Sequence, residues 1–383
     1  MKYFVILFTL AFSTLIAAPV VTVTKSGAEK TVVTIETAGG VELKAYNSSL
    51  SRNLERSGYF KVGPNGQIRI KGAPGSSVEA RGAGKSVTSS TSFSDAKGAR
   101  MAARQFADTI IEAHTKKKGF STKRIAFVNR KGPDNAELYT CYPDGYDIRQ
   151  LTSDNCAAVG PRWAPNGQDI YYTGFLQKTP LVYRINMEGK RKLLAQFKGL
   201  ATGAAVSPDG NNCAIILSYQ GNPELYVLNF ATGRVKRMTK TPAASEASPC
   251  WSPDGTKIAY VSDETRRPQV YIIDVASKKS KRFTTKGKEN TSPDWGDDGR
   301  LTWTSKSQGQ SVIMIADPAA GASSAKVVTP AGSWENPSWA ADGRHIIASR
   351  DRALFIVDTD PDGDKPVQLF FNKGNWMNPS WSR

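Results

Sequence analysis

A short pattern built on tryptophan recurs between residue 163 and the end of the 383-residue sequence. In most copies a turn sequence such as Ser-Pro-Asp-Gly follows, and the next copy begins 42 to 45 residues later. The copies start at Trp163, Val206, Trp251, Trp295, Trp339 and Trp381. So regular a period is typical of repeat architectures, in which each copy is one supersecondary unit. We therefore expect the repeated tryptophans to pack between units rather than to bind a ligand.

Each copy predicts four short β-strands. Pro-Asp-Gly favours a turn whose glycine can adopt positive φ, and two runs rich in β-branched and aromatic residues follow. In the copy that starts at Trp251 these runs are residues 258–261 and 270–273, and a weaker run closes the unit at residues 282–284. Four strands in about 40 to 45 residues form a propeller blade. Helical solenoids share the period, but Pro and Gly in nearly every repeat exclude them.

Counting the predicted strands gives six blades. Residues 125–128, 137–140 and 148–152 are three strands without a tryptophan strand, and residues 378–381 are a tryptophan strand without followers. Together they complete a sixth blade, and closing the ring in this way removes the open sheet edges that favour aggregation. The predicted fold class is α+β: a small N-terminal α/β domain (residues 18–123) followed by a six-bladed propeller (residues 124–383).

The first residues predict a secretory signal peptide. After Lys2 an apolar run extends from Phe4 to Ala18 and ends in small residues, with cleavage expected after Ala17. The run is too short for a membrane-spanning helix, which needs about 20 apolar residues. We therefore expect residues 1–17 to be removed and the mature protein to be exported.

Residues 18–123 lack the repeat. We expect an extended segment at residues 20–24, a helix at residues 51–58 and a loop over the Gly- and Ser-rich residues 63–91. Ser94 is predicted to cap a second helix. Its apolar positions, at helical spacing before the lysines 116–118, are Ala99, Ala103, Phe106, Ile110 and Ala113.

The formal net charge of +17 raises the question of an acidic partner. Residues 18–123 hold 17 basic and 8 acidic residues, and residues 124–383 hold 33 and 26. Because both signs are interspersed, we interpret the excess as a basic surface rather than a nucleic-acid groove. An alternative is a binder of acidic envelope polymer, whose binding would depend steeply on salt.

Catalytic or metal-binding patterns are sparse, so we predict no enzyme, cofactor or metal. The only histidines, His114 and His345, lack neighbours at metal-ligand spacing. Residues 358–364 imitate the start of a calcium loop, but Leu369 stands where a bidentate Glu is required, so a hairpin turn is expected, with adventitious cation binding left open. Cys141, Cys156, Cys213 and Cys250 allow three disulfide pairings or isolated buried thiols.

The order of these parts resembles the TolB family, the periplasmic components of the Tol-Pal system. The resemblance covers the mature chain and is densest at residues 54–60, 119–127 and 137–146. It implies a monomeric, non-enzymatic connector that supports outer-membrane integrity and cell division. The alternative from another class is an exported propeller enzyme that acts on cell-wall glycan.

The resemblance also implies two partner sites. The links that precede the tryptophan strands would bind a Pal-like lipoprotein of the outer membrane through Leu200, Thr202, Gly203, Glu246, Ala247, Asn290, Thr291, Trp334, Glu335, Trp376 and Met377. A TolA-like inner-membrane protein would bind Val21, Thr22, Val23, Thr24, Lys25, Ser26 and Gly27. Among the first set, Trp334 and Trp376 are either exposed interface anchors or aromatics that pack on their own links.

Overall fold

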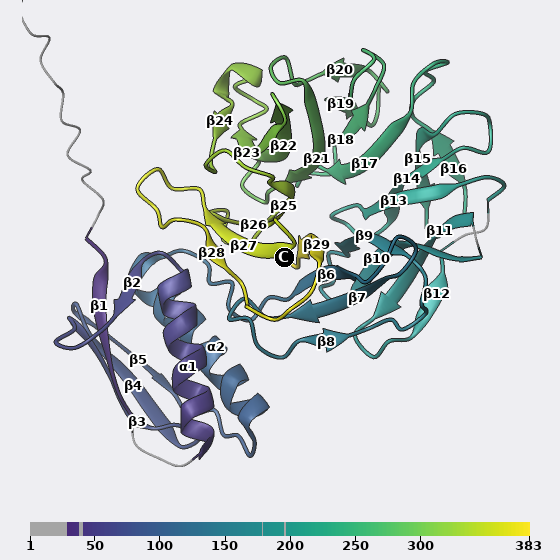
Figure 1. Cartoon of the computed structure of the whole chain (residues 1–383). Coiled ribbons are helices and arrows are strands. Elements are labelled where there is room, and N and C mark those ends of the chain that lie inside the picture. The colour runs from purple at the N-terminus through teal and green to yellow at the C-terminus, as the bar shows by residue number, and fades with distance from the viewer. Residues whose placement is uncertain (1–28, 38–40, 178, 195–196) are drawn as a thin grey trace, which may run out of the picture.

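A ring of sheets and a smaller two-layer domain make up the described part of the chain (Figure 1). The computed structural model describes residues 29–37, 41–177, 179–194 and 197–383. The predicted signal peptide (1–17), the extended segment at 20–24 and the proposed TolA-like site at 21–27 lie outside these residues.

Six four-stranded antiparallel sheets form the ring, as predicted. Blade 1 consists of β9 (Ala158–Trp163), β10 (Asp169–Gln177), β11 (Thr179–Asn186) and β12 (Arg191–Leu193). Blade 2 consists of β13 (Ala201–Val206), β14 (Asn212–Leu217), β15 (Glu224–Asn229) and β16 (Val235–Arg237). Blade 3 consists of β17 (Glu246–Trp251), β18 (Lys257–Ser262), β19 (Gln269–Asp274) and β20 (Ser280–Arg282).

The remaining blades follow the same plan. Blade 4 consists of β21 (Glu289–Trp295), β22 (Leu301–Ser307), β23 (Gln310–Ala316) and β24 (Lys326–Val327), with a 3-10 turn at Ala322–Ser324. Blade 5 consists of β25 (Glu335–Trp339), β26 (His345–Arg350), β27 (Ala353–Asp358) and β28 (Val367–Gln368). Blade 6 consists of β29 (Trp376–Trp381), β6 (Ile125–Arg130), β7 (Ala136–Cys141) and β8 (Arg149–Gln150).

Blade 6 closes the ring with the last strand of the chain. β29 pairs antiparallel with β6, with Trp381 opposite Ile125 and Trp376 opposite Asn129. Beyond the strand, the Ser382 amide donates to the Arg124 carbonyl at 2.8 Å. The predicted shared blade is therefore confirmed.

The first strand of each blade, which we call the inner strand, has a β-bulge at the same position. These strands are β9, β13, β17, β21, β25 and β29. The bulge residue adopts positive φ in every blade: Gly160, Gly203, Ser248, Ser292, Asn336 and Asn378. The register of each inner strand shifts across this residue. A bulge adds one residue and bends the strand, so the six bulges curve the inner strands around the channel.

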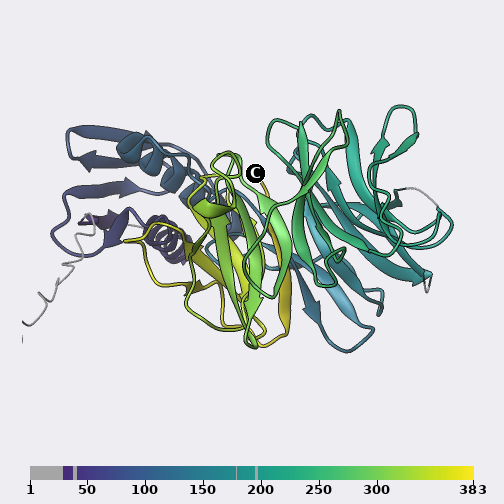
Figure 2. The same ribbon diagram turned by 90° about the horizontal axis from the view of Figure 1, so that it is seen from above.

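The small domain is a five-stranded sheet with two helices packed together on it (Figures 1 and 2). The sheet order is β2-β1-β3-β4-β5. The strands are β1 (Thr31–Thr37), β2 (Phe60–Val62), β3 (Ile68–Ala73), β4 (Ser77–Gly82) and β5 (Lys85–Ser89), and the helices are α1 (Val41–Arg56) and α2 (Ala96–Thr115). Figure 2 shows this domain beside the ring, next to the blades formed by the last residues.

Three expectations for this domain were wrong. The predicted loop at 63–91 contains β3, β4 and β5, because alternating side chains such as Ile68 and Ile70 are buried against the helices. The first helix begins at Val41, well before 51, and its polar Asn-Ser-Ser stretch concealed an apolar face of Tyr46, Leu50 and Leu54. The cap of α2 is Asp95, whose Oδ1 accepts from the Gly98 amide at 2.6 Å, rather than Ser94.

Deleting residues 378–383 should open the ring. The deletion removes most of β29 and leaves one edge of β6 without its partner. Since Trp381 alone is 2% exposed, we expect the free energy of unfolding to fall by about 3 kcal/mol or more in urea denaturation. The exposed-site variant Lys373→Ala is the control, and an unchanged midpoint and slope in the deletion would refute the closure.

Candidate partner-binding face and domain junction

The predicted Pal-like contacts gather at one end of the channel. They occupy the links before β13, β17, β21, β25 and β29 or the first residues of these inner strands, which Figure 1 shows around the centre of the ring. We call this end the mouth. The exposed residues are Ala247 and Glu335, and the half-buried ones are Leu200, Thr202, Gly203, Thr291 and Met377. Glu246, Asn290, Trp334 and Trp376 are buried.

The two tryptophans are not exposed anchors. Trp334 is 0% exposed, with its ring centroid 5.4 Å from that of Phe355. Trp376 is 6% exposed and stands edge-on to the rings of Phe127 and Phe370 at 5.4 and 5.3 Å. Each fills the space under its own link, because burying a large aromatic there stabilises the link. The alternative of packing on the link is therefore correct.

Asn290 also has a structural task. Its amide group donates to the Gln269 side-chain carbonyl and to the Lys286 carbonyl, each at 2.8 Å. Its own carbonyl accepts from the indole N–H of Trp303 at 2.9 Å. A side chain this fully engaged positions the link between β20 and β21 and has no group left for a partner.

Glu246 belongs to a buried pair of carboxylates beside the mouth. Its Oε1 accepts from the hydroxyls of Thr241 and Ser262 at 3.0 and 3.1 Å. Glu224 accepts from the Thr241 amide at 2.7 Å and from Arg237 at 2.9 Å. Burial raises the pKa of Glu246 to about 7, and the nearby carboxylate of Glu224 adds to this shift against the Thr241 and Ser262 hydrogen bonds. The link from β16 to β17 is therefore held by a group that titrates near neutral pH.

An ion pair crosses the channel below the mouth. Arg162 of blade 1 lies 2.5 Å from Asp294 of blade 4, the blade diametrically opposite. Arg383 also contacts Asp294 at 2.7 Å, and the Trp339 amide donates to the same carboxylate at 2.8 Å. Below this pair lies a cavity of about 470 Å³, walled by residues such as Trp251 and Pro253. Sequence reasoning missed the pair, although both residues directly precede the repeated tryptophan.

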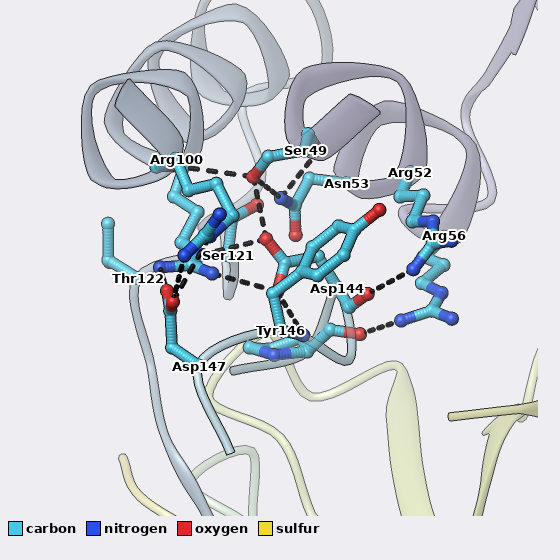
Figure 3. Close-up of polar contacts among 12 residues, drawn as sticks. Ser49, Arg52, Asn53, Arg56, Arg100, Ser121, Thr122, Asp144, Tyr146 and Asp147 are labelled. Carbon is cyan, nitrogen blue, oxygen red and sulfur yellow. Dashed lines mark hydrogen bonds and ion pairs between the residues drawn. The ribbon is translucent and has the colours of Figure 1, made fainter. Parts of the chain in front are cut away.

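The small domain is fastened to the ring by a buried ion-pair network (Figure 3). Arg104 of α2 and Asp144, in the turn between β7 and β8, are both 0% exposed. The guanidinium donates to the two carboxylate oxygens at 2.8 and 3.0 Å. Ser49 of α1 donates to the same carboxylate at 2.6 Å. The carboxylate of Asp147 forms ion pairs with Arg100 and Arg104. Burial alone would raise the pKa of Asp147, but the hydrogen bond from Arg100 and the charge of Arg104 hold it below its usual range.

Helix α1 adds arginines to the same turn. Arg52 donates to the Asp144 carbonyl at 3.0 Å and lies over the Tyr146 ring at 4.5 Å (Figure 3). Arg56 donates to the Leu369 carbonyl at 3.0 Å. Gly145 adopts φ +80°, and a Cβ there would lie 2.3 Å from the Leu369 carbonyl oxygen, so only glycine fits this junction.

A second contact lies where β2 meets blade 5. Arg344 donates to both carboxylate oxygens of Asp358 at 2.8 and 2.6 Å and lies over the ring of Tyr59 at 4.5 Å. The Nδ1 atom of His345 lies 2.6 Å from the Asp342 carboxylate. The centroid of its ring is 5.0 Å from that of Phe120, in the segment between α2 and β6. Residues 358–364 connect β27 to β28, and Asp358 is already engaged by Arg344. The described residues contain no cluster of three or more potential metal ligands.

The four cysteines, all described, are free thiols. Cys141, Cys213 and Cys250 are buried, and Cys156 is half-buried. Burial raises the pKa of Cys213 and of Cys250 to about 12, so both stay protonated and behave as small apolar side chains. The choice between bridges and isolated thiols is settled in favour of isolated thiols.

Asp144→Ala should loosen the junction. It removes the carboxylate that accepts two hydrogen bonds from the buried Arg104 guanidinium, and breaking a buried pair costs about 3 to 5 kcal/mol in the free energy of unfolding. The matched control is Glu79→Ala, which breaks the exposed pair with Arg81 and should change the free energy of unfolding little. Equal losses in urea denaturation of the two variants would contradict the junction's role.

Glu246→Gln should flatten the pH dependence of stability. Folding raises the pKa of Glu246 from about 4.3 to about 7, so the folded state binds this proton more tightly. The stabilisation that comes from protonated Glu246 is complete below about pH 4 and is lost as the pH rises through 7. Because one pKa unit corresponds to about 1.4 kcal/mol, the free energy of unfolding of the variant at pH 8, measured in urea, should be about 3 to 4 kcal/mol above that of wild type.

The control for this titration is Glu335→Gln, which removes an exposed carboxylate from the same mouth. Because this side chain is exposed, the variant should keep the free energy of unfolding of wild type at pH 8. A Glu246→Gln profile parallel to that of wild type between pH 5 and 8 would show that Glu246 does not titrate there.

Comparisons with known proteins agree on one family. The family model of the TolB beta propeller domain matches residues 111–383. The Tol-Pal system protein TolB of Desulfosudis oleivorans is 28% identical over 138 residues, which cover 36% of this chain and 31% of that relative. The aligned part thus spans about a third of the relative's length. None of the helices in the described ranges is long and apolar enough to cross a membrane.

Solved structures share the fold. TolB from Acinetobacter baumannii matches with a TM-score of 0.81 and 23% identity, covering 94% of this chain and 98% of that one. A putative TolB from Agrobacterium tumefaciens matches with a TM-score of 0.53 and 21% identity, covering 67% and 92%. Because the family model spans most of the chain and the ring with its small α/β domain has the TolB fold, this chain belongs to the TolB β-propeller family.

Proposed function

We propose that this protein is a periplasmic, non-enzymatic connector of the Tol-Pal envelope system. The observation that carries the proposal is the match of residues 111–383 to the TolB propeller family, in a chain whose small domain is also present. The relative from Desulfosudis oleivorans is named a Tol-Pal system protein. Residues 1–17 would direct export, and the mature chain would support outer-membrane integrity and cell division as a monomer.

The mouth would bind a Pal-like lipoprotein. Its exposed and half-buried residues, such as Ala247, Thr291 and Met377, lie on a closed ring. A closed ring cannot spread, so little conformational entropy is lost when a partner docks on it. The buried members of the predicted set, such as Asn290 and Trp376, would act indirectly by holding the links in place.

The segment at residues 21–27 would bind a TolA-like inner-membrane protein. The described chain begins just after it, and Lys30 pairs there with Asp364 in the turn between β27 and β28. The first described residues therefore lie beside the propeller. The two partners would be coupled by binding exchange, with the buried Arg104–Asp144 junction keeping the domains in one geometry.

Binding of purified proteins tests the proposal. Residues 18–383 would be titrated calorimetrically with the soluble domain of the Pal-like lipoprotein from the same genome and, separately, with the C-terminal domain of its TolA-like protein. We expect both to bind with dissociation constants in the micromolar range or tighter, and deletion of residues 21–27 to abolish only the TolA-like interaction.

Two charge variants locate the first site. Thr291→Arg places a bulky cation in the mouth and should weaken Pal-like binding at least about 10-fold. Lys278→Glu, in the turn after β19 at the opposite end of the blades, should have little effect. A folded wild-type protein that binds neither partner would refute the proposed function.

A further inference from the structure

The link that closes the ring departs from the internal repeat. We call residues 369–375, between β28 and β29, the closing link. In blades 6, 2, 3 and 4, the position that Phe370 occupies here is a threonine, and the next residue is small, polar or proline. The corresponding pairs are Thr152-Ser153, Thr239-Lys240, Thr284-Thr285 and Thr329-Pro330.

The repeated threonine has a structural role that the closing link gives up. Its hydroxyl accepts from the first amides of the third strand, as Thr239 does from Leu225 at 2.9 Å and Thr284 from Val270 at 3.0 Å. In the closing link Phe370 is instead buried, 7% exposed, against Phe127 and Trp376. Packing in the core therefore explains why a phenylalanine occupies position 370.

Packing in the core does not explain the phenylalanine at position 371. It is 86% exposed, more than any other exposed large hydrophobic residue in the described ranges, of which the next is Val327 at 54%. Leaving a phenylalanine in water forgoes the free energy of its burial, so folding does not account for it. Exposed aromatic side chains on a rigid frame are the usual anchors of protein interfaces.

The other exposed aromatics lie on the same side. Phe175 ends near the turn from β10 to β11 and is 37% exposed, and Tyr219 lies between β14 and β15 and is 38% exposed. Turns between the second and third strands of a blade lie at the end of the ring where the inner strands begin, because strands alternate in direction. The exposed aromatics of the described chain therefore share the mouth end.

Four cationic residues lie in the closing link or in the segments that contact its end. Its Asn375 carbonyl accepts from the Arg130 amide at 2.9 Å, and the Trp376 amide that follows it donates to the Arg352 carbonyl at 3.1 Å. Arg130, Lys131, Arg352 and Lys373 are all exposed, and no carboxylate of the described residues forms an ion pair with them. Cations without an ion-pair partner at the same link as an exposed aromatic fit a partner whose apolar pocket has an acidic rim.

We propose that Phe371 is an anchor of the Pal-like interface, inserted into an apolar pocket with an acidic rim on that lipoprotein. This inference rests on the proposed function. The four cations steer the partner onto the ring, and Phe371 supplies the contact whose loss speeds dissociation. Phe371 lies in the closing link, so the docked partner would also contact the segment that leads into blade 6.

Phe371→Ala tests the anchor against a matched variant. Val327→Ala also truncates an exposed apolar side chain, but on the outer strand of blade 4. Titration with the soluble domain of the Pal-like lipoprotein should show affinity reduced about 10- to 30-fold for Phe371→Ala and unchanged for Val327→Ala. Both variants should keep the thermal unfolding midpoint of wild type, because neither side chain is buried.

Charge is tested by Lys131→Ala/Lys373→Ala against Lys278→Ala/Lys279→Ala at the opposite end. The first pair should bind more weakly and lose part of the salt dependence between about 50 and 500 mM NaCl, and the second should match wild type. If wild type binds but Phe371→Ala binds equally well, the anchor is refuted while the proposed function stands. If wild type does not bind, the proposed function fails and the inference fails with it.

Discussion

Pairing of the last strand with the first propeller strand is the constraint on which the rest of this structure depends. Strands β29 and β6 come from opposite ends of the propeller sequence, and their pairing closes six sheets into a ring. Without it, the edge of β6 and the face of blade 5 that packs on β29 would be exposed, and the inner strands would have no common axis. The mouth and the ion pair across the channel between Arg162 and Asp294 both require that axis.

Blade 6 has a second structural role, because the small domain packs on it. The turn that holds Asp144 connects β7 and β8 of this blade, and Arg104 reaches it from α2. Arg56 of α1 also reaches the Leu369 carbonyl, at the start of the closing link. Closure, domain junction and the exposed Phe371 are thus concentrated in one blade and the link that enters it.

The sequence predicted the ring well because its evidence is periodic. The recurring tryptophan and Pro-Asp-Gly turns gave the blades, and the leftover strands at residues 125–152 and 378–381 gave the closure. The small domain was predicted less well: glycines and serines at 63–91 suggested a loop, while burial of alternating residues such as Ile68 and Ile70 makes strands. Single-residue exposure was the weakest point. Trp334 and Trp376 look like exposed anchors in the sequence, but packing under the links buries them. Phe371 was overlooked, although comparison of the repeats with one another would have singled it out.

Native-state hydrogen exchange of the closing strand tests the closure most directly. If β29 is an integral inner strand, its amides and those of β6 should exchange only through global unfolding, with the same free energy as β17 and β21. Exchange of β29 at a free energy several kcal/mol below that of β17 would contradict the account, because the ring would then open in the native state.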